Sequence, residues 1–190
     1  MAEKKHTQDP LDLEEAMSSS EAFIIKYKNK FLAGIAAIVI VVGGVLGYQN
    51  FISEPNEKKA SEALYRGEQY FMADNYELAL NGDSLGFEGL LKVAEKYSGT
   101  AAGKLANAYA GLSYAQLGQY DKAAATLVKA ADKANSQALS PIYLIQAGQI
   151  YEKLGKNSEA VKAYQTVKEK YPNNYLSMDI DKYIERASVK

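Results

Sequence analysis

Hydrophobic and polar positions divide this chain into three parts. Residues 31–52, FLAGIAAIVIVVGGVLGYQNFI, form an uncharged and almost wholly apolar stretch, and the tail ahead of it, residues 1–30, is mainly polar. A helix needs about 20 apolar residues to cross a bilayer core, so the stretch predicts one transmembrane helix. Residues 53–190 place apolar side chains mostly at helical spacing. The pattern therefore predicts an all-α protein in which a single N-terminal transmembrane helix precedes a helical domain.

The apolar stretch is expected to remain as an anchor. A secretory signal has an apolar core of about 7–15 residues and a small-residue cleavage site. Here the apolar run is longer, and residues 47–52 at its exit contain no Ala-x-Ala pattern. Lys26, Lys28 and Lys30 lie at its N-terminal edge, whereas the first cation beyond it is Lys58. The positive-inside rule therefore predicts a cytoplasmic N-terminus and an extracytoplasmic domain.

The polar tail carries weaker signals. Residues 1–10 are expected to be disordered, and residues 11–17 fit a short amphipathic helix. Residues 18–21, Ser-Ser-Ser-Glu, are typical of a helix N-cap. We therefore expect the helix that enters the membrane to begin there.

One motif occurs twice in the C-terminal domain. Residues 111–118, GLSYAQLG, align with residues 148–155, GQIYEKLG. The alignment continues at the same offset and indicates two units, residues 104–137 and 141–174. A fixed repeat of this size is typical of solenoid proteins, in which neighbouring units share one core.

Each unit resembles the tetratricopeptide repeat, a helix–turn–helix of 34 residues. The resemblance implies that Gly111 and Gly148 let the first helix of a unit, helix A, approach the second, helix B. Ala123 and Ala160 are the expected small counterparts on helix B. An α-solenoid of such pairs is therefore expected.

The ends of these helices carry their own signals. Gly118 and Gly155 suit the left-handed position that ends a helix, and Pro172 cannot continue helix B of the last unit. Residues 53–100 are expected to form a degenerate first repeat with an insertion. Residues 175–190 predict an amphipathic capping helix, which a solenoid end needs.

Stacked repeats of this family have a concave face lined by helix A residues. Because the predicted lining is mostly apolar, it favours an extended or helical apolar peptide over an acidic tail. The alternative, that several of these side chains only pack against the neighbouring repeat, stays open. The predicted groove residues are Leu64, Phe71, Leu105, Leu112, Gln116, Ile142, Ile145, Gln149 and Lys153.

A second contact surface is predicted within the membrane. Gly43 and Gly47 are four residues apart, so they share one helix face. Small residues at this spacing allow close contact between membrane helices. We expect a contact there with another chain or with a second copy of this one.

Composition argues against catalysis and against nucleic-acid binding. The chain has no cysteine and one histidine, His6, which lies in the polar tail. Residues 99–104, GTAAGK, have too few residues between the glycines and lack the Ser/Thr of a phosphate-binding loop. The formal net charge of −1 offers no basic surface for nucleic acid. We therefore expect no catalytic, cofactor or metal site.

The overall layout resembles the YfgM-type membrane-anchored envelope proteins of bacteria. The likeness extends to residues 81–83, Asn-Gly-Asp, followed by Phe87. It implies a single-pass inner-membrane protein whose periplasmic repeat domain assists the protein-export translocon or envelope chaperones, with exported polypeptides as further partners. The alternative is a scaffold for cell-wall synthesis, division or outer-membrane assembly. A homo-oligomer is compatible with either function.

Overall fold

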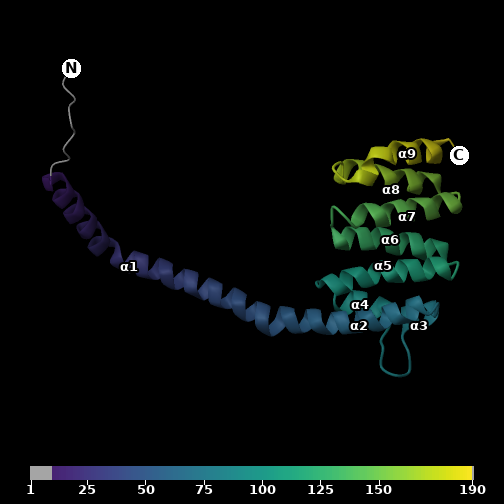
Figure 1. The fold of residues 1–190 in the computed structure, drawn as a ribbon, viewed down its shortest axis with the longest axis horizontal. Coiled ribbons are helices and arrows are strands. Elements are labelled where there is room, and N and C mark those ends of the chain that lie inside the picture. Colours follow the sequence, from purple (N-terminus) through teal and green to yellow (C-terminus); the bar gives the residue numbers. More distant parts are fainter. Residues whose placement is uncertain (1–9, 190) are drawn as a thin grey trace, which may run out of the picture. The chain divides into compact units, whose positions relative to one another are not determined.

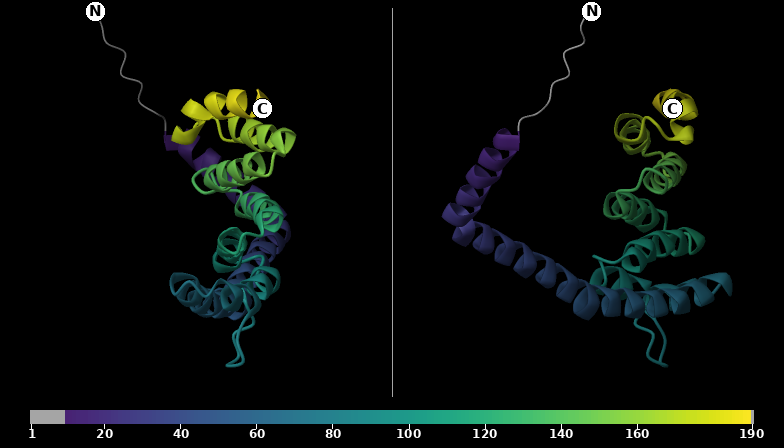
Figure 2. Two further views of the ribbon diagram at one scale, coloured as in Figure 1. Left: turned by 90° about the vertical axis from the view of Figure 1, so that its right-hand side faces the viewer. Right: turned by 60° about the vertical axis from the view of Figure 1, so that its left-hand side comes forward.

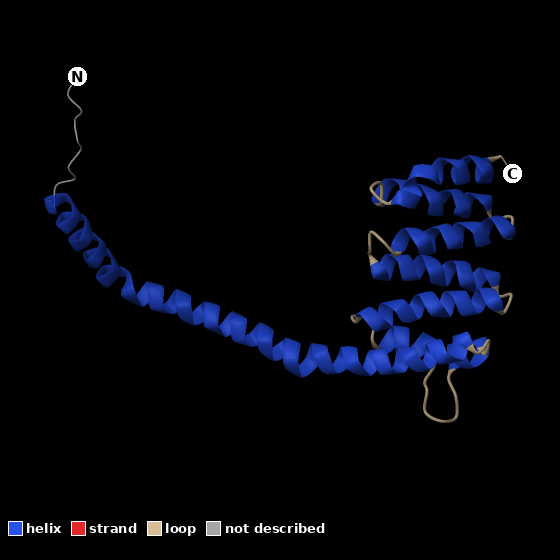
Figure 3. Cartoon of the chain, viewed as in Figure 1, coloured by secondary structure: helices blue, strands red, loops and turns tan. Residues whose placement is uncertain are grey.

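The computed structural model describes the backbone of residues 10–189 and the side chains of residues 25–189. The described backbone is helical and contains no strand (Figure 3), which confirms the predicted all-α class. The chain forms two compact units, Met1–Phe51 and Ile52–Lys190. The predictions for residues 1–9, including His6, lie outside the described part.

The first unit contains helix α1, Pro10–Tyr48. The prediction that this helix starts near residues 18–21 was wrong, because α1 passes through them without a break. Proline suits a first helical position, where its missing amide hydrogen would have no partner, and serines inside a helix carry only a small penalty. Among the described residues, one helical run, Ile25–Met72, is long and apolar enough to cross a membrane. None of its most apolar window is buried, so it is not a core helix of this chain.

A π-helical turn, η1 (Gln49–Ser53), separates α1 from α2 (Glu54–Met72). Pro55 lies at the start of α2. It has no amide hydrogen to donate to the carbonyl of Phe51, and its ring crowds that carbonyl. The wider turn relieves this conflict locally.

Two helical pairs form the centre of the second unit. Helix α5 (Ala101–Gln116) pairs with α6 (Tyr120–Ala134), and α7 (Ser140–Lys153) pairs with α8 (Asn157–Lys170). Figure 1 shows these helices stacked in chain order, and the views in Figure 2 agree. The pairs are the helix–turn–helix units that the sequence predicts.

Two glycines allow helices A and B to approach each other closely. A Cβ built on Gly111 would lie 2.8 Å from the side chain of Leu127, and one on Gly148 would lie 2.3 Å from Tyr164. The contacted residue is thus not the alanine predicted as the counterpart but the larger residue four positions later. Both alanines are fully buried, so they fill the core beside this contact.

The predicted helix ends are confirmed. Gly118 and Gly155 have φ angles of 73° and 71°, in the left-handed region. Helix α8 ends at Lys170, two residues before Pro172. These short signals therefore fix where each helix stops.

The first repeat of the stack, which belongs to the second compact unit, has a divided helix B. Helix α2 serves as helix A, and α3 (Tyr76–Asn81) and α4 (Leu90–Lys96) follow it. A Cβ on Gly67 of α2 would lie 2.4 Å from the side chain of Leu90. Since Gly67 thus contacts α4 as Gly111 contacts α6, α4 takes the position of helix B. The predicted insertion forms a loop between α3 and α4.

The C-terminal cap differs from the single helix that the sequence predicts. A 3-10 turn, η2 (Tyr175–Asp179), precedes the helix α9 (Ile180–Ser188). The Asn174 side chain accepts a hydrogen bond from the amide of Leu176 at 2.9 Å, which stabilises this turn. The cap is therefore bent where one straight helix was expected.

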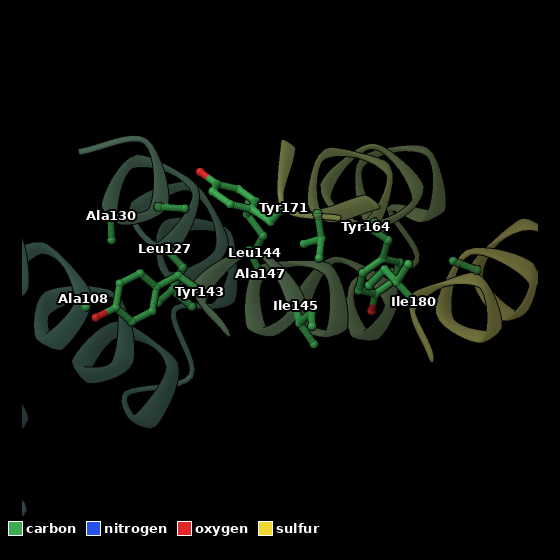
Figure 4. Packing of buried hydrophobic residues seen from close by; sticks show 14 residues of the cluster. Ala108, Leu127, Ala130, Tyr143, Leu144, Ile145, Ala147, Tyr164, Tyr171 and Ile180 are labelled. Carbon is green, nitrogen blue, oxygen red and sulfur yellow. The ribbon is translucent and has the colours of Figure 1, made fainter. Parts of the chain in front are cut away.

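Two hydrophobic clusters hold the second unit together. One includes Leu64, Phe87 and Leu90, and the other runs from α5 to α9. Figure 4 shows the second cluster, in which Leu127 and Tyr164 are fully buried. Each pair of helices thus completes its core only with its neighbours, as expected for a solenoid.

Candidate protein-binding groove

A first cavity of about 520 Å³ opens beside helices α2, α5 and α7. Leu64 comes from α2, Leu105 from α5 and Tyr143 from α7, and Leu139 lies just ahead of α7. All three helices are helix A elements of their units. The cavity therefore lies on the side of the stack where the sequence predicts a groove.

Glu57 fixes one wall of this first cavity. Its carboxylate accepts hydrogen bonds from the backbone amides of Ala101 and Ala102, both at 3.0 Å. The Thr100 hydroxyl accepts another from the amide of Gly103 at 2.9 Å. These oxygens accept hydrogen bonds from the free amides at the start of α5. The negative charge of Glu57 also interacts favourably with the positive end of the α5 helix dipole. The helices that line the cavity are thereby held in register.

A second cavity of about 470 Å³ lies between α7 and the C-terminal cap. Helix α7 contributes Ile142, Ile145 and Gln149, while the cap contributes Tyr175 and Tyr183. Tyr175 is 72% exposed, so its ring is available at the edge of the cavity. Helix α7 therefore borders both cavities, which together we call the groove.

The second cavity contains an unsatisfied polar group. Gln146 of α7 lines this cavity, and its Oε1 atom is buried without a hydrogen-bond partner. Buried acceptors in native proteins are almost always paired, and leaving one unpaired costs about 1–3 kcal/mol. The Gln146 oxygen thus lies beneath the wall of the second cavity and does not open into it.

The two cavities are close to electrically neutral. Glu57 and Lys104 are the charged side chains of the first cavity, and Asp179 of the second is paired with Lys182. Burial raises the pKa of the Tyr143 hydroxyl above its ordinary value, so this group stays protonated at neutral pH. Such a lining suits an apolar guest better than a charged one.

Five of the predicted groove residues line these cavities. Leu64 and Leu105 belong to the first, and Ile142, Ile145 and Gln149 belong to the second. These five positions of helix A therefore border a cavity. Binding itself stays a prediction.

The other four predicted residues line neither cavity. Phe71 packs edge-on against Tyr76 and Tyr109, with ring centroids 5.3 Å apart in each pair. Leu112 is half-buried against the core. For both residues, packing within the stack explains why the position is apolar.

Gln116 and Lys153 lie at the C-terminal ends of α5 and α7. Gln116 is exposed, and the Lys153 ammonium lies 3.8 Å from the ring centroid of Tyr120. A cation over an aromatic face is itself a stabilising contact. Lys153 therefore has a partner inside the domain.

Sequence reasoning missed several lining residues. Leu139 lies in a turn ahead of α7, and Tyr143 occupies a neighbouring position on that helix. Tyr175 and Tyr183 belong to the cap, which was treated only as a cover for the last repeat. The two tyrosines after Pro172 were the available signal, but their contact with α7 depends on how the chain folds back.

The other predicted sites have simple outcomes. A Cβ added at Gly43 or Gly47 would meet nothing within 4 Å, so the small-residue face of α1 is open. The helix contact predicted there stays a prediction.

In the described part of the chain, no three His, Cys, Asp or Glu side chains are grouped so as to hold a metal ion.

Comparison with known families identifies one tetratricopeptide repeat, at residues 143–174. No curated protein and no solved structure matched the chain. Proteins with this repeat are generally interaction modules without catalytic activity, and no catalytic family was found. The matched residues include α7 from Tyr143 onward and all of α8, and of the cavity lining they contain Tyr143, Ile145, Gln146 and Gln149. A tetratricopeptide repeat, and with it an interaction module, is what the comparisons support.

Proposed function

We propose that this chain is a membrane-tethered protein-interaction module whose groove holds an apolar segment of another protein. The observation that carries the proposal is the pair of mainly apolar cavities that share α7. Apolar walls of this kind supply affinity for an apolar guest. The tetratricopeptide repeat at residues 143–174 supports this class of function.

A guest that reached from one cavity to the other would have a defined length. Leu139 in the first cavity and Gln149 in the second are separated by ten residues of chain, or about 15 Å along a helix. An extended peptide covers this distance with about five residues. The guest is therefore a short apolar segment with anchor side chains at both ends.

The tether gives the groove a cellular setting. The exposed apolar helix is the proposed membrane span, and the cluster of Lys26, Lys28 and Lys30 at its N-terminal edge favours a cytoplasmic tail. The repeat domain then lies outside the cytoplasm at the bacterial inner membrane. Unfolded exported chains expose apolar segments there, so we propose a role beside the translocon or envelope chaperones.

Photo-crosslinking in native membranes tests this function. A photoreactive amino acid replaces Gln149 in the second cavity or, as a matched control, Gln165, an exposed glutamine of helix α8 outside both cavities. We expect translocon subunits, chaperones or exported polypeptides to crosslink from Gln149 and not from Gln165. Division or cell-wall proteins at Gln149 would favour the scaffold alternative. Equal adducts from both positions would contradict groove binding.

A further inference from the structure

A third cavity lies on helix α1, at the N-terminal edge of the proposed membrane span. Its volume is about 550 Å³, and all of its described lining residues belong to α1. They recur at intervals of three and four positions, so they share one face of the helix. The cavity is therefore separate from the groove. Its lining consists of Tyr27, Lys30, Phe31, Gly34, Ile35 and Ile38.

Gly34 opens the apolar part of the third cavity. A Cβ added at Gly34 would meet nothing within 4 Å, so the backbone is uncovered there. The side chains of Phe31, Ile35 and Ile38 around it are 52%, 59% and 64% exposed. A glycine between larger apolar side chains leaves a hollow in which another apolar chain can approach the helix closely.

The other end of the third cavity is positively charged. The ammonium groups of Lys26 and Lys30 lie 5.7 and 5.5 Å from the ring centroid of Tyr27. These two lysines are four residues apart, so they lie on the same side of the helix. The sequence has no acidic residue from position 22 to position 53. The charge at this edge is therefore not balanced along the span.

The two ends of the third cavity are spaced like the two parts of a phospholipid. Lys30 and Ile38 are eight residues apart, or about 12 Å along a helix, and half of a bilayer hydrocarbon core is about 15 Å thick. Lysine extends toward the headgroups at the end of a span, and tyrosine favours the same interface. With the span in a bilayer, the lysines lie among headgroups and the hollow at Gly34 lies among acyl chains.

We propose that the third cavity binds one anionic phospholipid. Its headgroup phosphate pairs with Lys26 and Lys30, and one acyl chain fills the hollow at Gly34. The proposal rests on the membrane span of the proposed function, because the bilayer supplies the lipid. Unbalanced lysines beside a span attract anionic lipids, and an apolar hollow on the same helix face adds contact with the chain. Such a lipid holds the anchor at one depth.

Native mass spectrometry of the full chain in detergent tests this site by titration with phosphatidylglycerol or phosphatidylcholine of the same chain length. Both lipids carry a phosphate, but only phosphatidylglycerol has a net negative charge. We expect phosphatidylglycerol to bind wild type at least about fivefold more tightly. Equal binding of the two lipids overturns the proposal. A dimer without bound lipid overturns it as well, because the face would then be a contact between helices.

Lysine variants test the position of the headgroup. Lys30→Gln should weaken phosphatidylglycerol binding by about fivefold. Lys28→Gln is the matched control, because it removes the same charge at the same edge from a residue outside the cavity lining. Lys28 lies about 160° around the helix from Lys30, so its loss should leave binding nearly unchanged. Equal losses for the two variants would indicate a general surface attraction and would overturn the site.

The hollow has its own variant. Gly34→Leu fills it and should weaken phosphatidylglycerol binding by at least about fivefold, because the acyl chain loses its contact with the helix. Ala36→Leu adds bulk on the opposite face, outside the cavity lining, and should have no effect. Glycerol phosphate, a headgroup without chains, should not displace the lipid. Its displacement of the lipid, or wild-type affinity in Gly34→Leu, overturns the proposal.

Failure of this site is distinguishable from failure of the proposed membrane tether. A full chain that does not enter nanodiscs would overturn both. A chain that enters nanodiscs but binds the two lipids equally would overturn the lipid site alone. The variants at positions 28, 30, 34 and 36 all lie outside the groove, so peptide binding beside α7 should be the same in each.

Discussion

Glu152 joins three helices through its carboxylate. It lies on α7, accepts a hydrogen bond from the Tyr164 hydroxyl of α8 at 2.7 Å, and pairs with Arg186 of α9 at 2.6 and 3.0 Å. The Glu152 side chain is 8% exposed, so water screens these contacts little. This residue therefore holds the cap against the last repeat, where the second cavity lies.

Glu152→Gln should destabilise the domain. The substitution leaves the Arg186 guanidinium without its charged partner, which costs about 1–3 kcal/mol. Denaturant unfolding of the full chain measures the change. Asp181→Asn is the control, because Asp181 pairs with Lys168 in an exposed bridge that contributes about 0–1 kcal/mol. Equal losses in the free energy of unfolding for the two variants would show that the Glu152 contacts stabilise the domain no more than an exposed ion pair does.

Asp83 should make stability depend on pH. The Tyr70 hydroxyl and the amide of Phe87 hold the pKa of Asp83 below its ordinary value of 3.8. A carboxyl whose folded pKa is lowered adds stability that is complete above the unfolded pKa and is lost as pH falls through the folded pKa. The free energy of unfolding of Asp83→Asn should thus lie below that of wild type at pH 7, and the gap should narrow below about pH 4. A gap that stays constant from pH 7 to 3 contradicts this assignment.

At the scale of single elements, the glycine of helix A sets the distance between paired helices. Gly148 touches the fully buried ring of Tyr164, and the turn after α7 then reverses the chain at Gly155. Both positions are recognisable in the sequence because each needs a residue without a side chain. The close pairing of α7 and α8 follows from these two positions.

Gly148→Ala should loosen this pair. The new methyl group would lie 2.3 Å from Tyr164, and overpacking of this kind costs about 1–3 kcal/mol. Thermal unfolding reports the change. Gly99→Ala is the control, since a Cβ there meets nothing within 4 Å and the backbone needs no left-handed angle. The packing account fails if both variants unfold at the wild-type temperature.

The sequence predicts the repeats well and the cap poorly, for a physical reason. Local signals such as Gly118, Gly155 and Pro172 fix helix ends, and the helix A register places Leu105 and Ile142 at the cavities. The positions of Tyr175 and Tyr183 depend instead on where a bent cap returns to α7, which is a non-local contact. The start of α1 was misplaced because a serine run is compatible with both a cap and a helix interior.

At the scale of the whole molecule, we propose that the apolar helix fixes the location of the protein and that the repeat domain carries the recognition. The apolar helix has no buried window and offers no core of its own, so its length and composition favour a bilayer as its solvent. The repeat domain has two apolar clusters and needs no other partner to bury them. The groove beside α7 is the surface that we propose for recognition.

The proposed orientation can be measured directly, because the natural chain has no cysteine. We expect Glu159→Cys in the repeat domain to react with a membrane-impermeant maleimide in intact spheroplasts. Ala2→Cys in the tail should react only after the membrane is permeabilised. The reverse pattern would place the domain in the cytoplasm and remove the envelope role.

The central claim is that the groove beside α7 binds an apolar segment of a partner. The most direct measurement is the affinity of the full chain in nanodiscs for a synthetic peptide of the segment that crosslinks to Gln149. Ile142→Ser, in the second cavity, should weaken binding by at least about tenfold, while Val161→Ser on α8, a partly buried residue outside both cavities, should not. If Ile142→Ser binds the peptide as tightly as wild type does, the groove is not the binding site.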